Sequence, residues 1–326
     1  MTTQPPAAAP GPAPAGPRRT WRPAYPVDPG LVLGFLCRGP GDPAYRTAPD
    51  GAVWRASRTP AGPGTLRVAA RPAEGAVEAQ AWGPGAQWLL DRLPALLGDG
   101  DDPAGFVPDP RHRVLYDAHR RHPGLRIGRT GLVLESLVPA VLEQKVTSDE
   151  AYRGWRLLLQ RFGTPAPGPA AAYGSPVARM RVAPAARDWA LVPSWEWHRA
   201  GVDAKRAGTV VRAARLAPRL EEASALDPVA AAARLTAVPG IGPWTAAETL
   251  QRSNGDPDAV TVGDLHLPNT VGWALAGRPR TDDAGMLELL EPYRGHRYRA
   301  CRLICLTGLR ALRRGPRLAP RDFRAI

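Results

Sequence analysis

Two features of this chain combine residue types that could do chemistry: a turn rich in glycine, and an acidic residue in the loop that follows it. The turn, Pro-Gly-Ile-Gly at residues 239–242, interrupts a helical pattern that resumes at Pro243. Glycine can take left-handed dihedrals, so the chain can reverse at Gly240 and Gly242. Backbone N–H groups at the start of the next helix then suit a phosphate oxygen. An ordinary turn between two helices, without a ligand, is an equally good interpretation of these four residues alone.

A helical hairpin must position this turn, and the sequence marks its ends. An Asp-Pro pair is typical of a helix start, and an Asn-Gly pair is typical of a helix end. These signals predict a hairpin over residues 228–253. The acidic residue, Asp264, then lies in a Gly/Pro-rich loop at residues 255–268 that leads into an apolar helical segment. By itself, Asp264 could be no more than the N-cap of that segment.

The charge of the chain favours a polyanionic partner. Lys and Arg total 43 against 30 Asp and Glu, a formal net charge of +13. No hydrophobic run approaches the length that spans a membrane, so we expect nucleic acid and no membrane. Because only two of the 43 cations are lysines, an Arg-rich codon bias is the alternative source of the charge. Three cysteines match neither a disulfide framework nor a four-cysteine metal site, which favours a reducing cytoplasm.

The N-terminal part of the chain predicts a small antiparallel sheet. Residues 1–20 are rich in Pro and Ala without the apolar core of a signal peptide, so we expect a disordered tail there. Short segments with turn signals between them at residues 31–39, 52–59, 65–72 and 76–83 indicate strands, the later ones by their alternation of apolar and polar residues.

Beyond about residue 112 the pattern is helical. Apolar residues recur there at spacings of three and four. A further helix at residues 86–98 is expected to pack on the sheet and to bend or end at Pro94. We therefore predict a mainly α protein, with an α+β domain over residues 21–112 and an all-helical domain over residues 113–326.

The two motifs together indicate a family. VPGIGPWTA at residues 238–246 and GDPDAVTVGDLHLPNTVGWAL at residues 255–275 resemble the helix-hairpin-helix (HhH-GPD) DNA glycosylase superfamily. They look most like its 3-methyladenine DNA glycosylase II, or AlkA-type, branch. The resemblance covers roughly residues 115–310 and implies an enzyme of base excision repair. Such an enzyme flips a damaged base, here an alkylated purine, out of double-stranded DNA and hydrolyses its N-glycosidic bond as a monomer.

The resemblance also assigns roles at the reaction centre. Asp264 matches the catalytic carboxylate, which would stabilise the oxocarbenium-like sugar and orient or deprotonate water. Trp244 stands where the bifunctional glycosylase/lyases have a lysine nucleophile, so strand cleavage through a Schiff base is not expected. Trp244 would instead line the base pocket. A core aromatic that covers the hairpin is the alternative for Trp244.

The same alignment places other pocket residues. Glu248 falls where the branch has a pocket tyrosine, and Cys305 falls where it has a pocket tryptophan. These two lost aromatics weaken the expectation of stacking against cationic bases. Trp195, Trp197 and Trp273 could replace them, and Trp273 is the one that we assign to the pocket.

The DNA contacts that the resemblance implies come from three segments. Gln144 and Lys145 lie in the turn that enters the DNA where the base leaves, with Lys145 at the position of an apolar wedge. Arg294 and Arg297 begin the C-terminal helix, where they could face phosphates or solvent. The hairpin residues expected to contact DNA are Pro239, Gly240, Ile241, Gly242 and Thr245.

No organic cofactor is implied. The backbone carbonyls of Thr236, Val238 and Gly240 match positions that hold a monovalent cation, Na⁺ or K⁺, in related proteins. An iron-sulfur cluster is not expected, because Cys301 and Cys305 are the only cysteines near the C-terminus. Two other functions stay open: a DNA-binding helix-hairpin-helix protein without catalysis, and a glycosylase for another lesion such as hypoxanthine.

Overall fold

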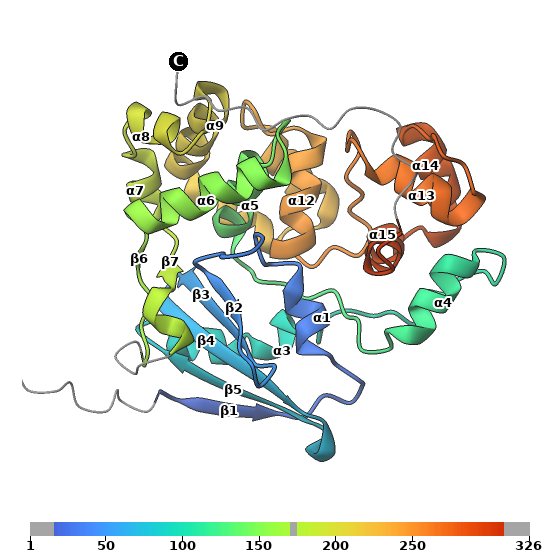
Figure 1. The fold of residues 1–326 in the computed structure, drawn as a ribbon, viewed down its shortest axis with the longest axis horizontal. Coiled ribbons are helices and arrows are strands. Elements are labelled where there is room, and N and C mark those ends of the chain that lie inside the picture. The colour runs from blue at the N-terminus through green and yellow to red at the C-terminus, as the bar shows by residue number, and fades with distance from the viewer. Residues whose placement is uncertain (1–15, 170–174, 310–326) are drawn as a thin grey trace, which may run out of the picture.

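A five-stranded antiparallel sheet and a larger layer of helices make up the protein (Figure 1). The computed structural model describes residues 16–169 and 175–309. The strand order in the sheet is β1-β5-β4-β3-β2. In chain order the strands are β1 (Arg18–Trp21), β2 (Tyr45–Thr47), β3 (Val53–Thr59), β4 (Gly62–Arg71) and β5 (Ala76–Trp82).

The strands predicted at residues 52–59, 65–72 and 76–83 are confirmed as β3, β4 and β5. The strand predicted at residues 31–39 is wrong, because α1 (Pro29–Gly34) occupies that segment. A short apolar run fits a strand or a buried helix equally well, and here the side chain of Asp28 caps the helix by accepting from Leu31 N at 3.1 Å. Part of the expected tail forms β1, which pairs with β5. Residues 1–15 lie outside the described residues.

Helices next to the sheet cover its apolar face. The segment predicted as one bent helix at residues 86–98 is two short helices, α2 (Ala86–Asp91) and α3 (Leu93–Leu96). Their buried leucines pack with the buried valines of β3, β4 and β5 and with Val32 and Leu33 of α1. One small core therefore belongs to the sheet.

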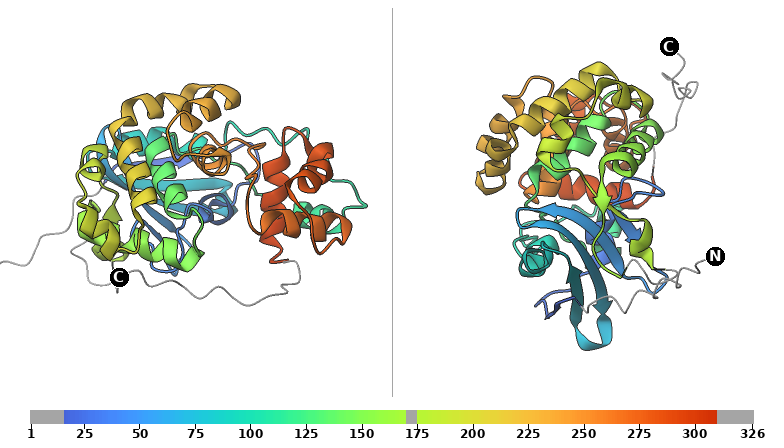
Figure 2. Two further views of the ribbon diagram at one scale, coloured as in Figure 1. Left: turned by 90° about the horizontal axis from the view of Figure 1, so that it is seen from above. Right: turned by 90° about the vertical axis from the view of Figure 1, so that its left-hand side faces the viewer.

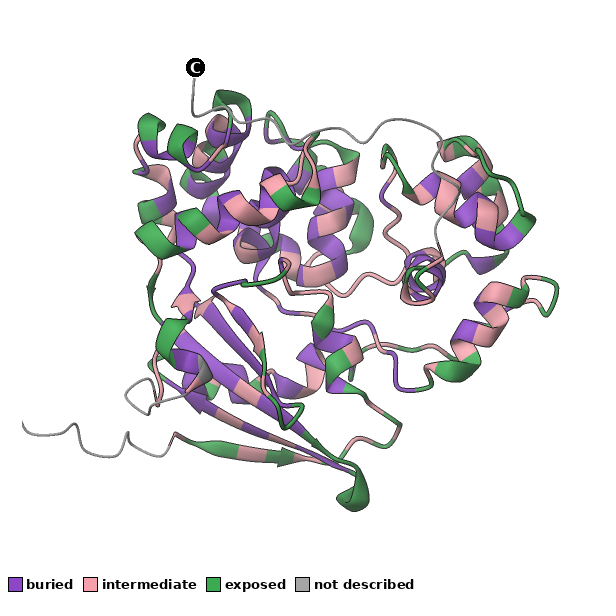
Figure 3. Cartoon of the chain, in the orientation of Figure 1, coloured by how far each residue is buried: buried purple, intermediate pink, exposed green. Residues whose placement is uncertain are grey.

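The remaining helices form two further clusters, which Figure 2 separates when the molecule is seen from above. The first cluster surrounds α5, whose residues are nearly all buried (Figure 3). The second cluster holds α4 and α13 to α15. In chain order these helices are α4 (Arg113–Arg121), α5 (Val133–Leu142), α6 (Ser148–Phe162), α7 (Ala186–Ala190), α8 (Ser194–Arg199), α9 (Ala204–Arg215), α10 (Ala217–Glu221), α11 (Pro228–Thr236), α12 (Pro243–Ser253), α13 (Leu267–Ala276), α14 (Asp283–Leu290) and α15 (Arg297–Leu306).

The chain is thus mainly helical with an N-terminal antiparallel sheet, as the sequence predicts. A short antiparallel pair of strands, β6 (Thr164–Pro165) and β7 (Arg181–Val182), follows α6. No helix of the described ranges is long and apolar enough to cross a membrane.

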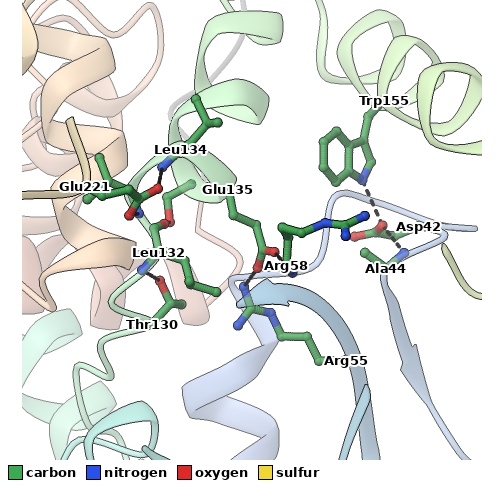
Figure 4. Close-up of polar contacts among 12 residues, drawn as sticks. Asp42, Ala44, Arg55, Arg58, Thr130, Leu132, Leu134, Glu135, Trp155 and Glu221 are labelled. Carbon is green, nitrogen blue, oxygen red and sulfur yellow. Dashed lines mark hydrogen bonds and ion pairs between the residues drawn. The ribbon is translucent and has the colours of Figure 1, made fainter. Parts of the chain in front are cut away.

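Buried polar contacts join the sheet to the helices (Figure 4). The carboxylate of Glu135 on α5 accepts from Arg55 Nη2 at 2.6 Å and from Arg58 N at 2.7 Å, and both donors belong to β3. Trp155 Nε1 on α6 donates to Asp42 Oδ1 at 2.9 Å. A buried charge needs such a partner, so these contacts fix the orientation of α5 relative to the sheet. Because α12 packs on α5, they also fix the position of the hairpin.

Candidate active site and nucleic-acid interface

The predicted hairpin is confirmed as α11, a turn and α12. Asp227 caps α11 by accepting from Val229 N and Ala230 N, each at 3.0 Å. Gly240 has φ +97°, and a Cβ there would lie 2.1 Å from Thr209 Oγ1. Gly242 is extended instead, with φ −96° and ψ 180°, and a Cβ there would meet nothing within 4 Å. The reversal therefore depends on Gly240, while Gly242 leaves open the space in front of the N-terminus of α12.

Side chains from other helices hold the turn in place. Gln144 Nε2 donates to the carbonyl of Gly240 at 2.9 Å and to Thr245 Oγ1 at 2.8 Å. The guanidinium of Arg212 donates to the carbonyl of Pro239 at 3.0 and 3.1 Å. Gln144, predicted to contact DNA, therefore braces the hairpin here, and Thr245 is buried beside it. Gln144 and Arg212 thus hold the turn from two other segments of the chain.

The hairpin side chains differ in what they can offer to a ligand. Pro239, Gly240 and Gly242 are exposed, whereas Ile241 is buried. Ile241 can therefore present only its backbone. The carbonyls of Val238 and Gly240 each accept one hydrogen bond within the protein, from Ile241 N and from Gln144. Each of these oxygens keeps a second lone pair, so both could coordinate a monovalent cation. The carbonyl oxygen of Thr236, at the end of α11, is the same kind of donor atom.

Asp264 lies against the hairpin. Its Oδ2 accepts from Trp244 Nε1 at 3.0 Å, and its Oδ1 accepts from His266 N and Leu267 N, each at 2.8 Å. The carboxylate thus bonds the backbone at the start of α13, where His266 is the N-cap residue, and it is also bonded to α12. Three N–H donors fix its orientation, and Asp264 is still partly exposed. The structure brings together the two residues, Trp244 and Asp264, that the sequence analysis assigned to the reaction centre.

Comparisons with known proteins show what the chain as a whole is similar to. No protein-family model matches the sequence. A curated relative from Mycobacterium tuberculosis, a probable bifunctional transcriptional activator/DNA repair enzyme AlkA, is 33% identical over 186 residues. The match covers 54% of this chain and 34% of the relative, so the chain spans about a third of the length of that protein.

Solved structures match most of the chain. The 3-methyladenine DNA glycosylase of Archaeoglobus fulgidus superimposes with a TM-score of 0.72 at 18% identity, over 88% of this chain and 97% of that one. The 8-oxoguanine glycosylase/lyase of Clostridium acetobutylicum gives 0.66 at 11% identity, over 88% and 95%. The chain has the helix-hairpin-helix DNA glycosylase fold and is similar to the AlkA-type branch.

In this glycosylase fold, the turn that carries the predicted wedge connects α5 to α6. Lys145 is exposed, and it is the one non-glycine residue with positive φ, 54°, in the described ranges. Such a conformation strains a residue with a Cβ. The turn is held on both sides, by Gln144 and by a capping box in which Thr147 and Glu150 bond each other at the start of α6. The surrounding contacts therefore impose the conformation of Lys145.

The two arginines predicted to face phosphates have carboxylate partners in the protein. Arg297 forms a bidentate salt bridge with Asp258, from Nε to Oδ1 at 2.8 Å and from Nη2 to Oδ2 at 2.5 Å. Arg294 is exposed and pairs with Glu291 at 2.7 Å. Arg297 therefore joins α15 to the loop that carries Asp264. The ion pair of Arg294 is exposed, so it holds the side chain only weakly.

Two of the residues predicted to line the pocket, Glu248 and Cys305, have polar side chains. Glu248 lies one turn after Trp244 on α12, and its Oε2 accepts from Arg252 Nη1 at 2.7 Å. Cys305 is exposed on α15, and Trp273 is half-buried on α13. Trp195 and Trp197 do not replace the lost aromatics: Trp197 is buried in the core around α5, and α8 lies far from α13 (Figure 1).

Three residues at this face of α12, Arg252, Phe35 and Arg302, were not predicted from the sequence. The Arg252 guanidinium carbon lies 5.3 Å from the centre of the Phe35 ring, and that of Arg302 lies 4.5 Å from it. Phe35 follows α1, so segments distant in sequence meet here. The spacing of Trp244, Glu248 and Arg252 by four could have revealed Arg252. No local pattern could have placed Phe35 or Arg302 beside it.

Proposed function

We propose that this protein is a monofunctional DNA glycosylase of base excision repair, acting as a monomer in the cytoplasm. The observation that supports it most is the carboxylate of Asp264, oriented by Trp244 and two backbone amides beside a glycine turn. A site that only binds phosphate does not need a carboxylate opposite the turn. Hydrolysis of an N-glycosidic bond does need one. This distinction disfavours a DNA-binding protein without catalysis.

The chemistry follows from the charge of that carboxylate. As the N-glycosidic bond breaks, positive charge develops on the sugar, and a preorganised carboxylate stabilises it. The same group orients or deprotonates the attacking water. Trp244 has no amine to form a Schiff base, so the product is an abasic site in an unbroken strand.

The hairpin would hold the DNA backbone. The exposed glycine positions let a phosphate approach the N–H groups of α12 without meeting a side chain. A Na⁺ or K⁺ ion on the carbonyls of Thr236, Val238 and Gly240 would add positive charge there and take no part in the reaction. Lys145 would fill the gap left by the flipped base with its aliphatic stem.

The proposed substrate is an alkylated purine in double-stranded DNA, from the likeness to the AlkA-type branch. A deaminated purine such as hypoxanthine is the second candidate, because Glu248 and Cys305 stand where that branch has pocket aromatics. The reaction is the same in both cases, and the side chains of the pocket determine which base is released.

The test is release of free base from duplexes that carry methylated purines, hypoxanthine, uracil or a bulkier adduct. We expect at least one lesion to be released, leaving a strand that stays intact until alkali treatment. Strand cleavage without alkali would contradict the monofunctional assignment. Binding to abasic-site DNA without release of any base in the panel would support the non-catalytic alternative.

Trp244 is expected to act by positioning Asp264. Trp244→Phe keeps a ring and removes the N–H donor at 3.0 Å, so kcat is expected to fall about 10-fold with little change in KM, because a hydrogen bond to a charged group contributes about 1.5–3 kcal/mol. Single-turnover kinetics measure this. Trp195→Phe, an exposed tryptophan on α8, is the control. A fall in affinity alone would assign Trp244 to base stacking only.

A further inference from the structure

Gly263, the residue directly before Asp264, is held from another helix. Its N–H donates to Oδ2 of Asp283, the first residue of α14, at 2.9 Å. Gly263 is exposed and has φ +86°, and a Cβ there would meet nothing within 4 Å. Because no side chain packs around this position, the hydrogen bond to Asp283 holds the backbone at this point.

The segment that carries Asp283 is itself fixed to α13. Asn269 Oδ1, on the first turn of α13, accepts from Thr281 N at 2.9 Å. Asp264 Oδ1 in turn bonds the backbone at the start of α13. The contacts therefore close a ring, from Asp264 to α13, from α13 to Thr281, and from Asp283 back to Gly263. This ring of contacts restricts the backbone on both sides of Asp264.

The position of α14 does not depend on Asp283 alone. Met286 and Leu290 of α14 are fully buried in the cluster that α14 shares with α13. Gly272 on α13 allows the close approach of the preceding segment, since a Cβ there would lie 1.8 Å from Thr281 Oγ1. The helix is thus a firm support from which Asp283 can hold the loop.

Other contacts hold the same loop farther from the carboxylate. Gln251 Nε2 on α12 donates to the carbonyl of Ala259 at 2.8 Å, and Arg297 on α15 pairs with Asp258. These contacts fix the first half of the loop, so they leave its last residues to the ring of contacts.

Helix capping does not account for Asp283. Asp282 is the N-cap residue of α14, and its Oδ1 accepts from Gly285 N at 2.9 Å. Asp283 Oδ1 is buried and has no hydrogen-bond partner in the described ranges, an arrangement that costs free energy. Attraction between a carboxylate and the start of a helix does not require a bond to Gly263. That bond therefore distinguishes Asp283 from a residue that only stabilises α14.

We propose that Asp283 is a positioning residue for Asp264 in base release and acts through the N–H of Gly263. This inference rests on the proposed function of Asp264. Trp244 orients the carboxylate from α12, whereas Asp283 holds its backbone from the separate cluster of α13 to α15 (Figure 1). A displacement of about 1 Å can lower a rate on the order of 100-fold, so one backbone contact can affect the reaction without touching the base.

Two variants of Asp283 separate its hydrogen bond from its charge. Asp283→Ala removes the acceptor, and the single-turnover rate constant for base release is expected to fall about 10-fold with little change in KM. Asp283→Asn keeps an oxygen acceptor without the charge and is expected to stay within about 3-fold of wild type. The rate constant is the readout, because partial unfolding of a preparation lowers the amplitude of the reaction and not its rate constant.

The neighbouring Asp282→Ala is the matched control. It removes the N-cap bond of α14 and is expected to lower the stability of the protein. Its rate constant is expected to stay within about 3-fold of wild type, because the buried Met286 and Leu290 keep α14 in place. Equal losses of rate in Asp282→Ala and Asp283→Ala would overturn the proposal, since both would then act through the folding of α14.

A second readout does not require base release. The indole N–H of Trp244 donates to Asp264, so its NMR resonance in protein labelled with ¹⁵N at tryptophan reports the position of that carboxylate. Trp244→Phe identifies the resonance by its loss. We expect the resonance to shift in Asp283→Ala and to keep its wild-type position in Asp283→Asn and in Asp282→Ala.

The outcomes separate this inference from the proposed function. An unchanged Trp244 resonance in Asp283→Ala would overturn the inference, and so would a rate constant that stays at the wild-type value. Equal losses in Asp283→Ala and Asp283→Asn would assign the effect to charge and would also overturn it. Absence of base release from the whole lesion panel by the wild-type protein would overturn the proposed function, and the resonance would still decide whether Asp283 positions Asp264.

Discussion

Asp264→Asn is expected to lower the rate of base release at least about 1000-fold, because it removes the charge that would stabilise the developing sugar cation and the base that would activate water. Binding to abasic-site DNA is expected to persist, since no base or leaving group remains for the carboxylate to act on. Asparagine is a good N-cap, so its Oδ1 can still accept from His266 N and Leu267 N. Rapid-quench measurement of free base under single-turnover conditions gives the rate.

Asp227→Asn is a matched control for this substitution. The Asp227 carboxylate accepts from two backbone amides at the start of α11, as the Asp264 carboxylate does at the start of α13. Asp227 begins the hairpin that Asp264 contacts, but no tryptophan side chain bonds its carboxylate. Its replacement is expected to leave base release within about 3-fold of wild type, because Asp→Asn at an N-cap changes stability little. Equal losses in both variants would mean that the effect at Asp264 comes from helix capping and not from chemistry.

Local signals in the sequence were sufficient to predict the hairpin. Asp-Pro at the start of α11 and Asn-Gly after α12 each mark a helix end within a few residues. The predicted bounds at 228 and 253 therefore match the structure. The alternation of apolar and polar residues that predicted β4 and β5 is equally local. The run at residues 31–39 was ambiguous, because its apolar residues suit either a strand or a helix and the cap at Asp28 decided between them.

The face of α12 beside Asp264 could be predicted only in part. Trp244 and Glu248 follow from the spacing of one helix, together with the family resemblance. Phe35 and Arg302 come from the end of α1 and from α15, whose approach to α12 depends on tertiary packing that no local pattern encodes. The same reason hid the contact of Gln144 with the hairpin, since its partners are about a hundred residues away in the chain.

The two glycines of the turn are expected to respond differently to substitution. Gly240→Ala places a Cβ 2.1 Å from the buried hydroxyl of Thr209 and requires φ near +97°. Left-handed strain and overpacking together are expected to lower the free energy of unfolding by about 3 kcal/mol, as measured by urea denaturation.

Gly242→Asp is expected to leave the fold intact and to remove DNA affinity. The backbone at Gly242 is extended, the added Cβ meets nothing within 4 Å, and Asp is favoured at a helix N-cap. Its carboxylate would occupy the place of a phosphate oxygen and repel the DNA backbone, so affinity at low salt is expected to fall on the order of 30-fold. Gly242→Asn adds the same bulk without the charge and should lose less.

Salt distinguishes the two causes of this loss. Screening weakens the repulsion between the introduced carboxylate and the phosphate but does not change the bulk of a side chain, so the affinities of Gly242→Asp and Gly242→Asn are expected to converge as salt rises. Unchanged affinity in Gly242→Asp would place the DNA backbone elsewhere and leave Pro-Gly-Ile-Gly as a turn without a ligand. A loss confined to Gly240→Ala would mean the same, because that variant acts on the fold and not on the surface in front of α12.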